Sequence, residues 1–197
     1  VAAQKLGITL IHQEPISFPD LSVAENLVLG RSEDGWFSTV PWAEMTREAR
    51  RYMDLLGVNI DVTRPMRGLS IADQQMVEIA RALASDSRLI IMDEPTAPLT
   101  PREVETLFTI ARRLRDEGRT IVFISHRLEE VRALCDRVTI FRDGNKIATD
   151  TIDNLSDADI IRLMIGRPLK EYMHKEATSI GDVALEVEGL TLPGVFS

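Results

Sequence analysis

Residues 88–100 read RLIIMDEPTAPLT, and this stretch decides the fold. Four consecutive apolar residues, 89–92, favour a strand buried on both faces, as in a parallel sheet covered by helices. The run ends at Asp93 and Glu94, and Pro95 cannot continue the pairing. Open α/β sheets place their ligands outside the carboxyl ends of such strands. The two carboxylates suit Mg²⁺ brought by a phosphate ester, with one of them as a base, although taken alone the pair favours a solvated acidic turn.

The composition is that of an ordinary globular protein. The chain has 197 residues, of which 44% are hydrophobic, with a net charge of −8 and one cysteine, Cys135. The acidic balance argues against a general nucleic-acid binder, which usually carries a basic face. A single cysteine excludes an internal disulfide and fits a reducing compartment. No apolar run approaches the roughly 20 residues of a membrane span, so we expect any membrane role to depend on a partner.

Two further strand patterns stand on either side of this stretch in the sequence. Residues 7–12 form the first, close to the start of the chain, which we expect to run directly into it. Residues 120–124 form the other, after a helix pattern over residues 101–117. The order strand, helix, strand is typical of a parallel sheet with right-handed crossovers.

Polar side chains follow all three predicted strands, namely Gln13, the pair Asp93 and Glu94, and His126. If the strands are neighbours in one parallel sheet, these side chains converge on a single crevice. An amide, a metal-binding carboxylate, a base carboxylate and an imidazole together suit phosphoryl transfer to water.

The remaining segments are mostly helical. Between the first two strands, Ser22 and Glu25 have the spacing of a capping box, residues 42–56 carry an apolar face, and Ser70 has the position of an N-cap. After the third strand the patterns predict, in order, a helix over 128–134, a hairpin around 143–145, a capped helix over 156–165, a polar linker from 167, and a strand over 184–192.

These motifs resemble the nucleotide-binding domains of ABC transporters. In family order, the resemblance rests on Gln13 as the Q-loop glutamine, LSIADQQ (69–75) as the signature loop, LIIMDEP (89–95) as Walker B, APLT (97–100) as the D-loop, and His126 as the switch histidine. IHQE (11–14), LSVAEN (21–26) and FISHRLEEV (123–131) are further similar to the ATPases of bacterial monosaccharide importers of the ribose, xylose and galactose type. In that subfamily two ATPase domains are fused in one chain.

The resemblance implies an α/β fold of the P-loop NTPase type, with a parallel-sheet core and an inserted helical subdomain. It divides the chain into 1–18 (core strand and Q-loop), 19–87 (helical subdomain with the signature loop), 88–166 (core with Walker B, D-loop and switch histidine), 167–183 (linker) and 184–197 (first strand of a second ATPase domain).

The resemblance also implies roles for single residues. Asp93 would hold Mg²⁺, Glu94 would polarise the attacking water, and His126 would contact the γ-phosphate. Gln13 would touch the metal and signal to the membrane subunit. Nucleotide binding would further involve Ser70, Asp73 and Gln74 of the signature loop and Thr100 of the D-loop, with Ser70 reaching the ATP of a facing domain.

The sequence departs from the family in three places. No glycine is followed by lysine, so the Gly-Lys-Ser/Thr phosphate loop, Walker A, is absent from these 197 residues. We therefore expect a fragment that hydrolyses no ATP alone, binds it weakly and exposes a sheet edge that favours self-association. Ile71 and Ala72 stand where the signature usually has two glycines, and Thr100 stands where the D-loop usually has aspartate.

Three functions fit these observations. The resemblance favours the ATPase subunit of a sugar importer on the cytoplasmic side of a bacterial inner membrane. Its implied partners are a second ATPase domain, transmembrane permease subunits and, indirectly, a periplasmic sugar-binding protein, with no nucleic acid. A soluble ABC ATPase of DNA repair or translation, and a regulatory or adaptor module that keeps the fold without turnover, are the alternatives.

Overall fold

The computed structural model describes residues 2–29, 41–85, 87–166, 185–189 and 191. The chain forms two compact units. Unit 1 consists of Val1–Val138 and Asp150–Asn154, and unit 2 consists of Thr139–Thr149 and Leu155–Ser197.

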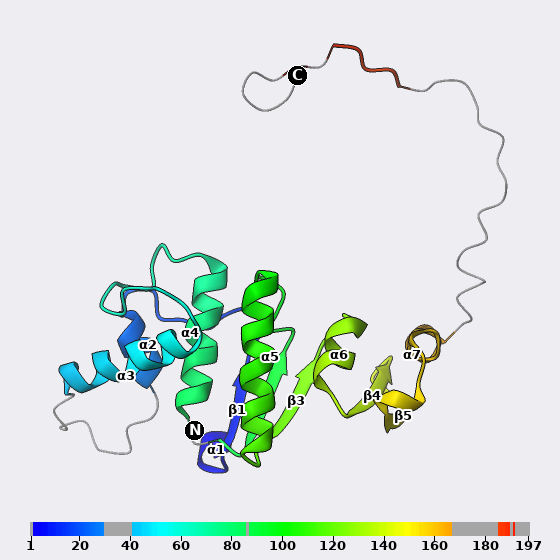
Figure 1. The fold of residues 1–197 in the computed structure, drawn as a ribbon, viewed down its shortest axis with the longest axis horizontal. Helices are drawn as coiled ribbons and strands as arrows, with labels where there is room; N and C mark the ends of the chain where they lie inside the picture. The colour runs from blue at the N-terminus through cyan, green and yellow to red at the C-terminus, as the bar shows by residue number, and fades with distance from the viewer. Residues whose placement is uncertain (1, 30–40, 86, 167–184, 190, 192–197) are drawn as a thin grey trace. The chain divides into compact units, whose positions relative to one another are not determined.

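Unit 1 is built on a parallel sheet of three strands in the order β1-β2-β3 (Figure 1). The strands are β1 (Ile8–Ile11), β2 (Leu89–Asp93) and β3 (Thr120–Ile124). Met92 in the central strand pairs with Ile11 on one side and with Phe123 on the other. The predicted α/β sheet is therefore confirmed, and the stretch that begins at residue 88 supplies its central strand.

Helices cover one face of this sheet. Helix α4 (Ile71–Ala84) contacts β1, and helix α5 (Pro101–Asp116) contacts β3. The phenyl rings of Phe108 in α5 and Phe123 in β3 meet edge to face, with 5.8 Å between their centroids. Because side chains alternate along a strand, the neighbouring positions point to the other face, where Leu10, Val122 and Ile124 are exposed.

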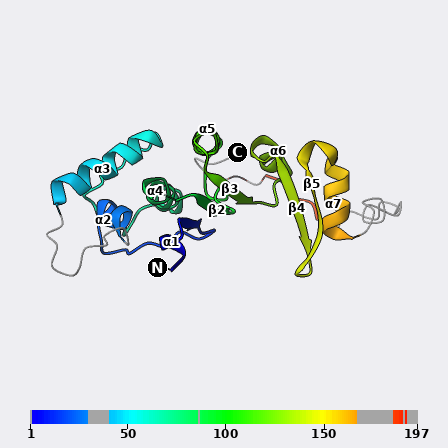
Figure 2. The same cartoon turned by 90° about the horizontal axis from the view of Figure 1, so that it is seen from below.

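A helical segment follows β1 in the chain and packs on α4. It contains α2 (Val23–Val28) and α3 (Trp42–Leu55), and the three helices contact one another, as Figure 2 shows. The predicted capping box of Ser22 and Glu25 begins α2. Apolar side chains from the three helices form the core of this segment: Val23, Leu27, Met45, Ala49, Met53, Met76 and Ile79.

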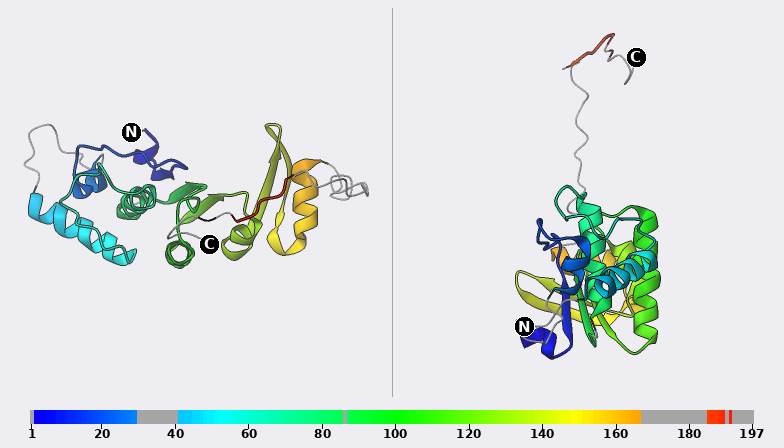
Figure 3. Two further views of the ribbon diagram at one scale, coloured as in Figure 1. Left: turned by 90° about the horizontal axis from the view of Figure 1, so that it is seen from above. Right: turned by 90° about the vertical axis from the view of Figure 1, so that its left-hand side faces the viewer.

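Helix α6 (Leu128–Leu134) follows β3 and leads into a hairpin of β4 (Arg137–Arg142) and β5 (Asn145–Thr151). The 3-10 turn η1 (Ile152–Asn154) comes next. In unit 2, α7 (Asp157–Ile165) begins at the predicted cap Ser156 and lies beside the hairpin (Figure 3), where Arg142 Nη1 donates to the carbonyl of Leu163.

Two expectations about secondary structure were wrong. A short helix, α1 (Ala2–Lys5), precedes β1, because Ala, Gln and Lys favour helix over strand. Residues 185–189 have no regular structure, and the Leu185 side chain is 80% exposed, so the strand predicted over 184–192 is not formed in its described part. A single strand without a pairing neighbour is not stable in water. The predicted linker, 167–183, lies outside the described residues.

The two faces of the sheet offer a matched test of stability. Ile90 is 1% exposed under the helices, whereas Ile124 on the uncovered face is 46% exposed. We expect Ile90→Ala to lower the free energy of unfolding by about 2–5 kcal/mol, because it leaves a cavity in a packed core. Ile124→Ala should cost about 1 kcal/mol or less. Urea denaturation followed by circular dichroism measures both, and equal losses would contradict the assignment of the faces.

Candidate functional site

Three strand ends meet at one carboxylate, that of Glu94. Glu94 follows β2 directly, while Gln13 and His126 each stand two residues beyond the end of β1 and β3. His126 Nδ1 donates to Glu94 Oε1 at 3.0 Å, and Gln13 Nε2 donates to Glu94 Oε2 at 3.4 Å. The predicted convergence of these three side chains is therefore present, and it follows from the parallel direction of the strands.

The backbone of Glu94 has an unusual conformation. Its φ is +43°, in the left-handed region that non-glycine residues seldom adopt, and its N–H donates to the carbonyl of Ile124 at 2.9 Å. Strained conformations of this kind persist when the surroundings over-determine them, and they cluster at functional sites. The hydrogen bond from the Glu94 N–H to the last residue of β3 is one such constraint.

His126 is accessible while Glu94 is partly enclosed. The side chain of His126 is 68% exposed and that of Glu94 is 27% exposed. Because an ionised carboxylate only accepts hydrogen bonds, the imidazole proton is on Nδ1 in this arrangement. Nε2 of a neutral imidazole is then an acceptor, and it becomes a donor only when the ring is protonated.

Asp93 is the last residue of β2 and pairs with Ile124 across the ladder. By strand alternation its side chain shares the uncovered face of the sheet with Ile91, and it is half-buried. Within the described part of the chain no three His, Cys, Asp or Glu side chains form a cluster that could hold a metal. A cation here would depend on Asp93, the amide oxygen of Gln13 and ligands from outside this part of the chain.

Glu130 in α6 is a site residue that the sequence analysis did not single out. Its buried carboxylate accepts hydrogen bonds from Thr96 Oγ1 at 2.8 Å, Ser125 Oγ at 3.0 Å and Arg127 Nη1 at 3.1 Å. It thereby ties the turn after β2 to the loop that carries His126. One signal was available in the sequence, because Glu130 stands on the apolar face of its helix, four residues before Leu134.

The other predicted nucleotide-binding residues lie at the N-terminal ends of helices α4 and α5. Ser70 caps α4, where its Oγ accepts from the N–H of Asp73 at 3.1 Å and donates to the Asp73 carboxylate at 2.7 Å. Thr100 caps α5 in a capping box with Glu103, and Gln74 Nε2 donates to the carbonyl of Leu69. Within the described residues none of these side chains bonds to Gln13, Glu94 or His126.

Comparison with known sequences identifies the family of this chain. A sequence profile described as "ABC transporter" matches residues 2–97. A ribose import ATP-binding protein of Streptomyces avermitilis is 48% identical over 195 residues, and one of Rhodococcus jostii is 47% identical over 195 residues. The chain belongs to the ABC transporter ATP-binding family.

The ABC relatives are longer than this chain. Each alignment covers 99% of the chain but 39% of the relative. The chain therefore spans about two fifths of the length of the curated relatives that it matches.

Solved ABC structures share the fold. A nucleotide-free ATP-binding cassette from an ABC transporter superposes with a TM-score of 0.64 at 27% identity, over 82% of this chain and 70% of that one. A dimeric ATP-binding cassette bound to ADP and Pi gives a TM-score of 0.65 at 23% identity, over 74% of this chain and 62% of that one. In the described part of the ABC chain, no helix is both long and apolar enough to cross a membrane.

The role of Glu130 can be tested against its neighbour in the same helix. Glu130→Gln removes the charge that receives three hydrogen bonds, and we expect it to lower the free energy of unfolding by about 1–3 kcal/mol. The exposed Glu129 is the matched control, and Glu129→Gln should change stability by about 0.5 kcal/mol or less. Urea denaturation measures both, and equal effects would show that Glu130 is not the anchor of the two loops.

Proposed function

We propose that this chain supplies the metal-binding and water-activating residues of an ABC ATPase, and that the whole protein hydrolyses ATP to drive the import of a monosaccharide. The observation that carries the proposal is the position of Glu94, held between Gln13 and His126 at the carboxyl edge of the parallel sheet. A carboxylate with this surrounding suits phosphoryl transfer to water, in which positioning and charge stabilisation do most of the work.

Asp93 and Gln13 are the proposed metal residues. Both present oxygen donors, the ligand type that Mg²⁺ prefers, and Mg²⁺ commonly binds one or two carboxylates together with the phosphates of its nucleotide. Gln13 Nε2 donates to Glu94, so its amide oxygen is the atom suited to a cation. When bound with ATP, Mg²⁺ would neutralise charge on the phosphate oxygens.

Glu94 is the proposed general base. Each carboxylate oxygen can accept more than one hydrogen bond, so Glu94 can keep the contacts to Gln13 and His126 and still accept a proton from water. The two donors restrict its rotation and so hold it in position for the attacking water. The positive φ of Glu94 contributes to the same restriction.

His126 is the proposed contact to the γ-phosphate. While Nδ1 donates to Glu94, the imidazole can reach a phosphate oxygen as a donor only through Nε2. That arrangement requires the protonated ring, which would also add a positive charge beside the developing negative charge.

Ser70 is proposed to serve a second nucleotide, held by a facing ATPase domain. It stands at the N-terminus of the 14-residue helix α4, where backbone N–H groups and the helix dipole favour a phosphate. Asp73, Gln74 and Thr100 are assigned to nucleotide binding on the same proposal. Ile71 and Ala72 occupy the positions next to Ser70 where glycines would allow a closer backbone approach.

The proposed partners follow from the relatives, which are named for ribose import. We infer that residues 19–87 form the helical subdomain, that 184–197 begin a second ATPase domain, and that the protein works at the inner membrane with permease subunits. A sugar-binding protein would act through those subunits. Self-association through the edge strands β1 and β3 remains a prediction.

One substitution, Glu94→Gln, distinguishes the ATPase hypothesis from the adaptor hypothesis. In the whole protein, Glu94→Gln should lower kcat for ATP hydrolysis about 10²- to 10⁴-fold, because it removes the base, while Mg-ATP affinity stays within about threefold. Phosphate release and nucleotide titration measure the two quantities, with Glu129→Gln as a control that should leave both unchanged. An unchanged hydrolysis rate in Glu94→Gln would favour a regulatory or adaptor module.

The chain by itself should bind nucleotide poorly. It contains no Gly-Lys pair, and therefore no backbone cradle with a lysine for the phosphates. We expect isothermal calorimetry of the 197-residue chain to detect no Mg-ATP binding at micromolar concentrations. Micromolar affinity would contradict the assignment of the phosphate-gripping residues to a region outside this sequence.

A further inference from the structure

The turn that carries Gln13 is fastened to helix α4 by a buried carboxylate. Glu78, in the middle of that helix, is 3% exposed. Its Oε1 accepts from the backbone N–H of His12 at 3.3 Å, and its Oε2 accepts from the backbone N–H of Ile16 at 3.0 Å. The two amides lie on either side of the three residues 13–15, so one side chain fixes both ends of the turn.

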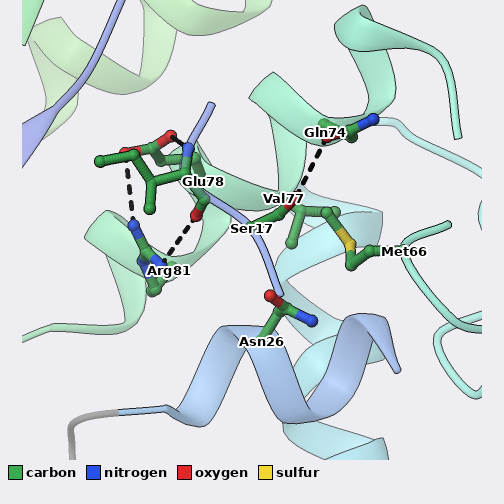
Figure 4. Close-up of a pocket in the computed structure, with 8 residues that line it drawn as sticks. Ser17, Asn26, Met66, Gln74, Val77, Glu78 and Arg81 are labelled. Atoms are coloured by element: carbon green, nitrogen blue, oxygen red, sulfur yellow. Dashed lines mark hydrogen bonds and ion pairs between the residues drawn. The ribbon is translucent and has the colours of Figure 1, made fainter. Parts of the chain in front are cut away.

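Neighbouring side chains of α4 complete this attachment. Gln75 Nε2 donates to the carbonyl of His12 at 3.3 Å, and Arg81 Nη1 donates to the carbonyl of Ile16 at 3.4 Å. Arg81 also pairs with Glu78 at 3.3 Å, as Figure 4 shows. The three side chains are spaced by three residues and therefore share one face of the helix. Both the donors and the acceptors at the ends of the turn are satisfied from that face.

Burying the polar side chains of Glu78 and Gln75 costs free energy that apolar side chains at these positions would not cost. A buried charge is unfavourable unless it is paired and hydrogen-bonded, and among the described residues Glu78 meets that condition through the turn and Arg81. Gln75 is fully buried, and its Oε1 has no hydrogen-bond partner in the described part of the chain. Its Nε2 can reach the carbonyl of His12 only with Oε1 turned away. Polar groups are thus buried where α4 meets the turn.

Helix α4 also begins at Ser70, eight residues before Glu78. At a rise of about 1.5 Å per residue, Glu78 lies roughly 12 Å along the helix from that end. Gln74, one turn closer to Ser70, accepts a hydrogen bond from Ser17 Oγ at 3.1 Å. The helix that presents Ser70 and the turn that presents Gln13 are therefore joined by several contacts within unit 1.

We propose that Glu78 is a positioning residue that locks the Gln13 turn to α4, so that Gln13 and Ser70 move as one body. The proposal rests on the proposed function, in which Gln13 serves one nucleotide and Ser70 serves the other. A shift of Gln13 at its own site then displaces the helix that reaches the second site. Glu78 touches neither nucleotide and acts only through the turn.

Amide hydrogen exchange on the 197-residue chain tests the attachment without nucleotide. Glu78→Gln keeps the shape but leaves one oxygen for two N–H donors, so the amides of His12 and Ile16 should exchange about tenfold faster or more. The amides of β2 should stay within about twofold of the wild type. Faster exchange throughout unit 1 would indicate a merely structural role, and unchanged exchange at His12 and Ile16 would also overturn the proposal.

Glu25 provides the matched control. Its carboxylate also accepts a backbone N–H, that of Ser22 at 2.7 Å, but it belongs to the cap of α2. Glu25→Gln should accelerate exchange at Ser22 and leave His12 and Ile16 unchanged. If Glu78→Gln does not fold, Arg81→Met removes the bond to the Ile16 carbonyl and the charge partner of Glu78. It should accelerate exchange at Ile16, and no acceleration would overturn the proposal.

A second measurement in the whole protein tests the consequence for Gln13. Glu78→Gln should raise the Mg²⁺ concentration for half-maximal ATP hydrolysis about tenfold, because a misplaced Gln13 supports the metal poorly. Glu25→Gln should leave it unchanged. An unchanged requirement in Glu78→Gln would show that the turn does not position Gln13. If the wild-type protein hydrolyses no ATP, the proposed function fails, whereas the exchange experiment still decides the attachment.

Discussion

The structure depends on the parallel hydrogen bonding of one central strand. β2 pairs with β1 and β3, and all three strands run in the same direction. Their carboxyl ends therefore lie at one edge of the sheet, where each releases a polar side chain into the same region. Gln13 and His126, which are far from Glu94 in the sequence, both contact the Glu94 carboxylate for this reason. The direction of the strands therefore matters more for the formation of the site than any single side chain does.

Two buried glutamates hold the segments that follow the three strands in fixed positions. Glu130 binds the turn after β2 and the loop after β3, and Glu78 binds the turn after β1 to α4. Each glutamate lies in a helix, so rigid elements hold the three irregular segments that emerge from the sheet. A site on supported loops keeps its distances better than one on free loops, and small displacements of catalytic groups are costly. The helices thus contribute to the site without supplying its reactive groups.

The proposed ATPase mechanism places different demands on two parts of α4. Its middle holds the Gln13 turn, while its N-terminus presents Ser70. If Gln13 and Ser70 serve two different nucleotides, the helix between them is the physical connection through which one site affects the other. Energetic coupling between sites requires an element whose position both of them bias. A helix anchored through buried polar contacts fits that requirement better than a flexible loop would.

The sequence by itself determined most of the local structure. Apolar runs, turn residues and cap spacings predicted the three strands, the caps at Ser22, Ser70 and Ser156, and the polar residues at the strand ends, because these signals depend on neighbours in the chain. Only the tertiary structure decided which backbone groups Glu78 and Glu130 bind and that Glu94 adopts a positive φ. Helical periodicity predicts the face on which a glutamate stands, but it does not indicate which distant loop packs there. The strand predicted over 184–192 shows the same limit, since alternation indicates a strand only where a neighbouring strand pairs with it.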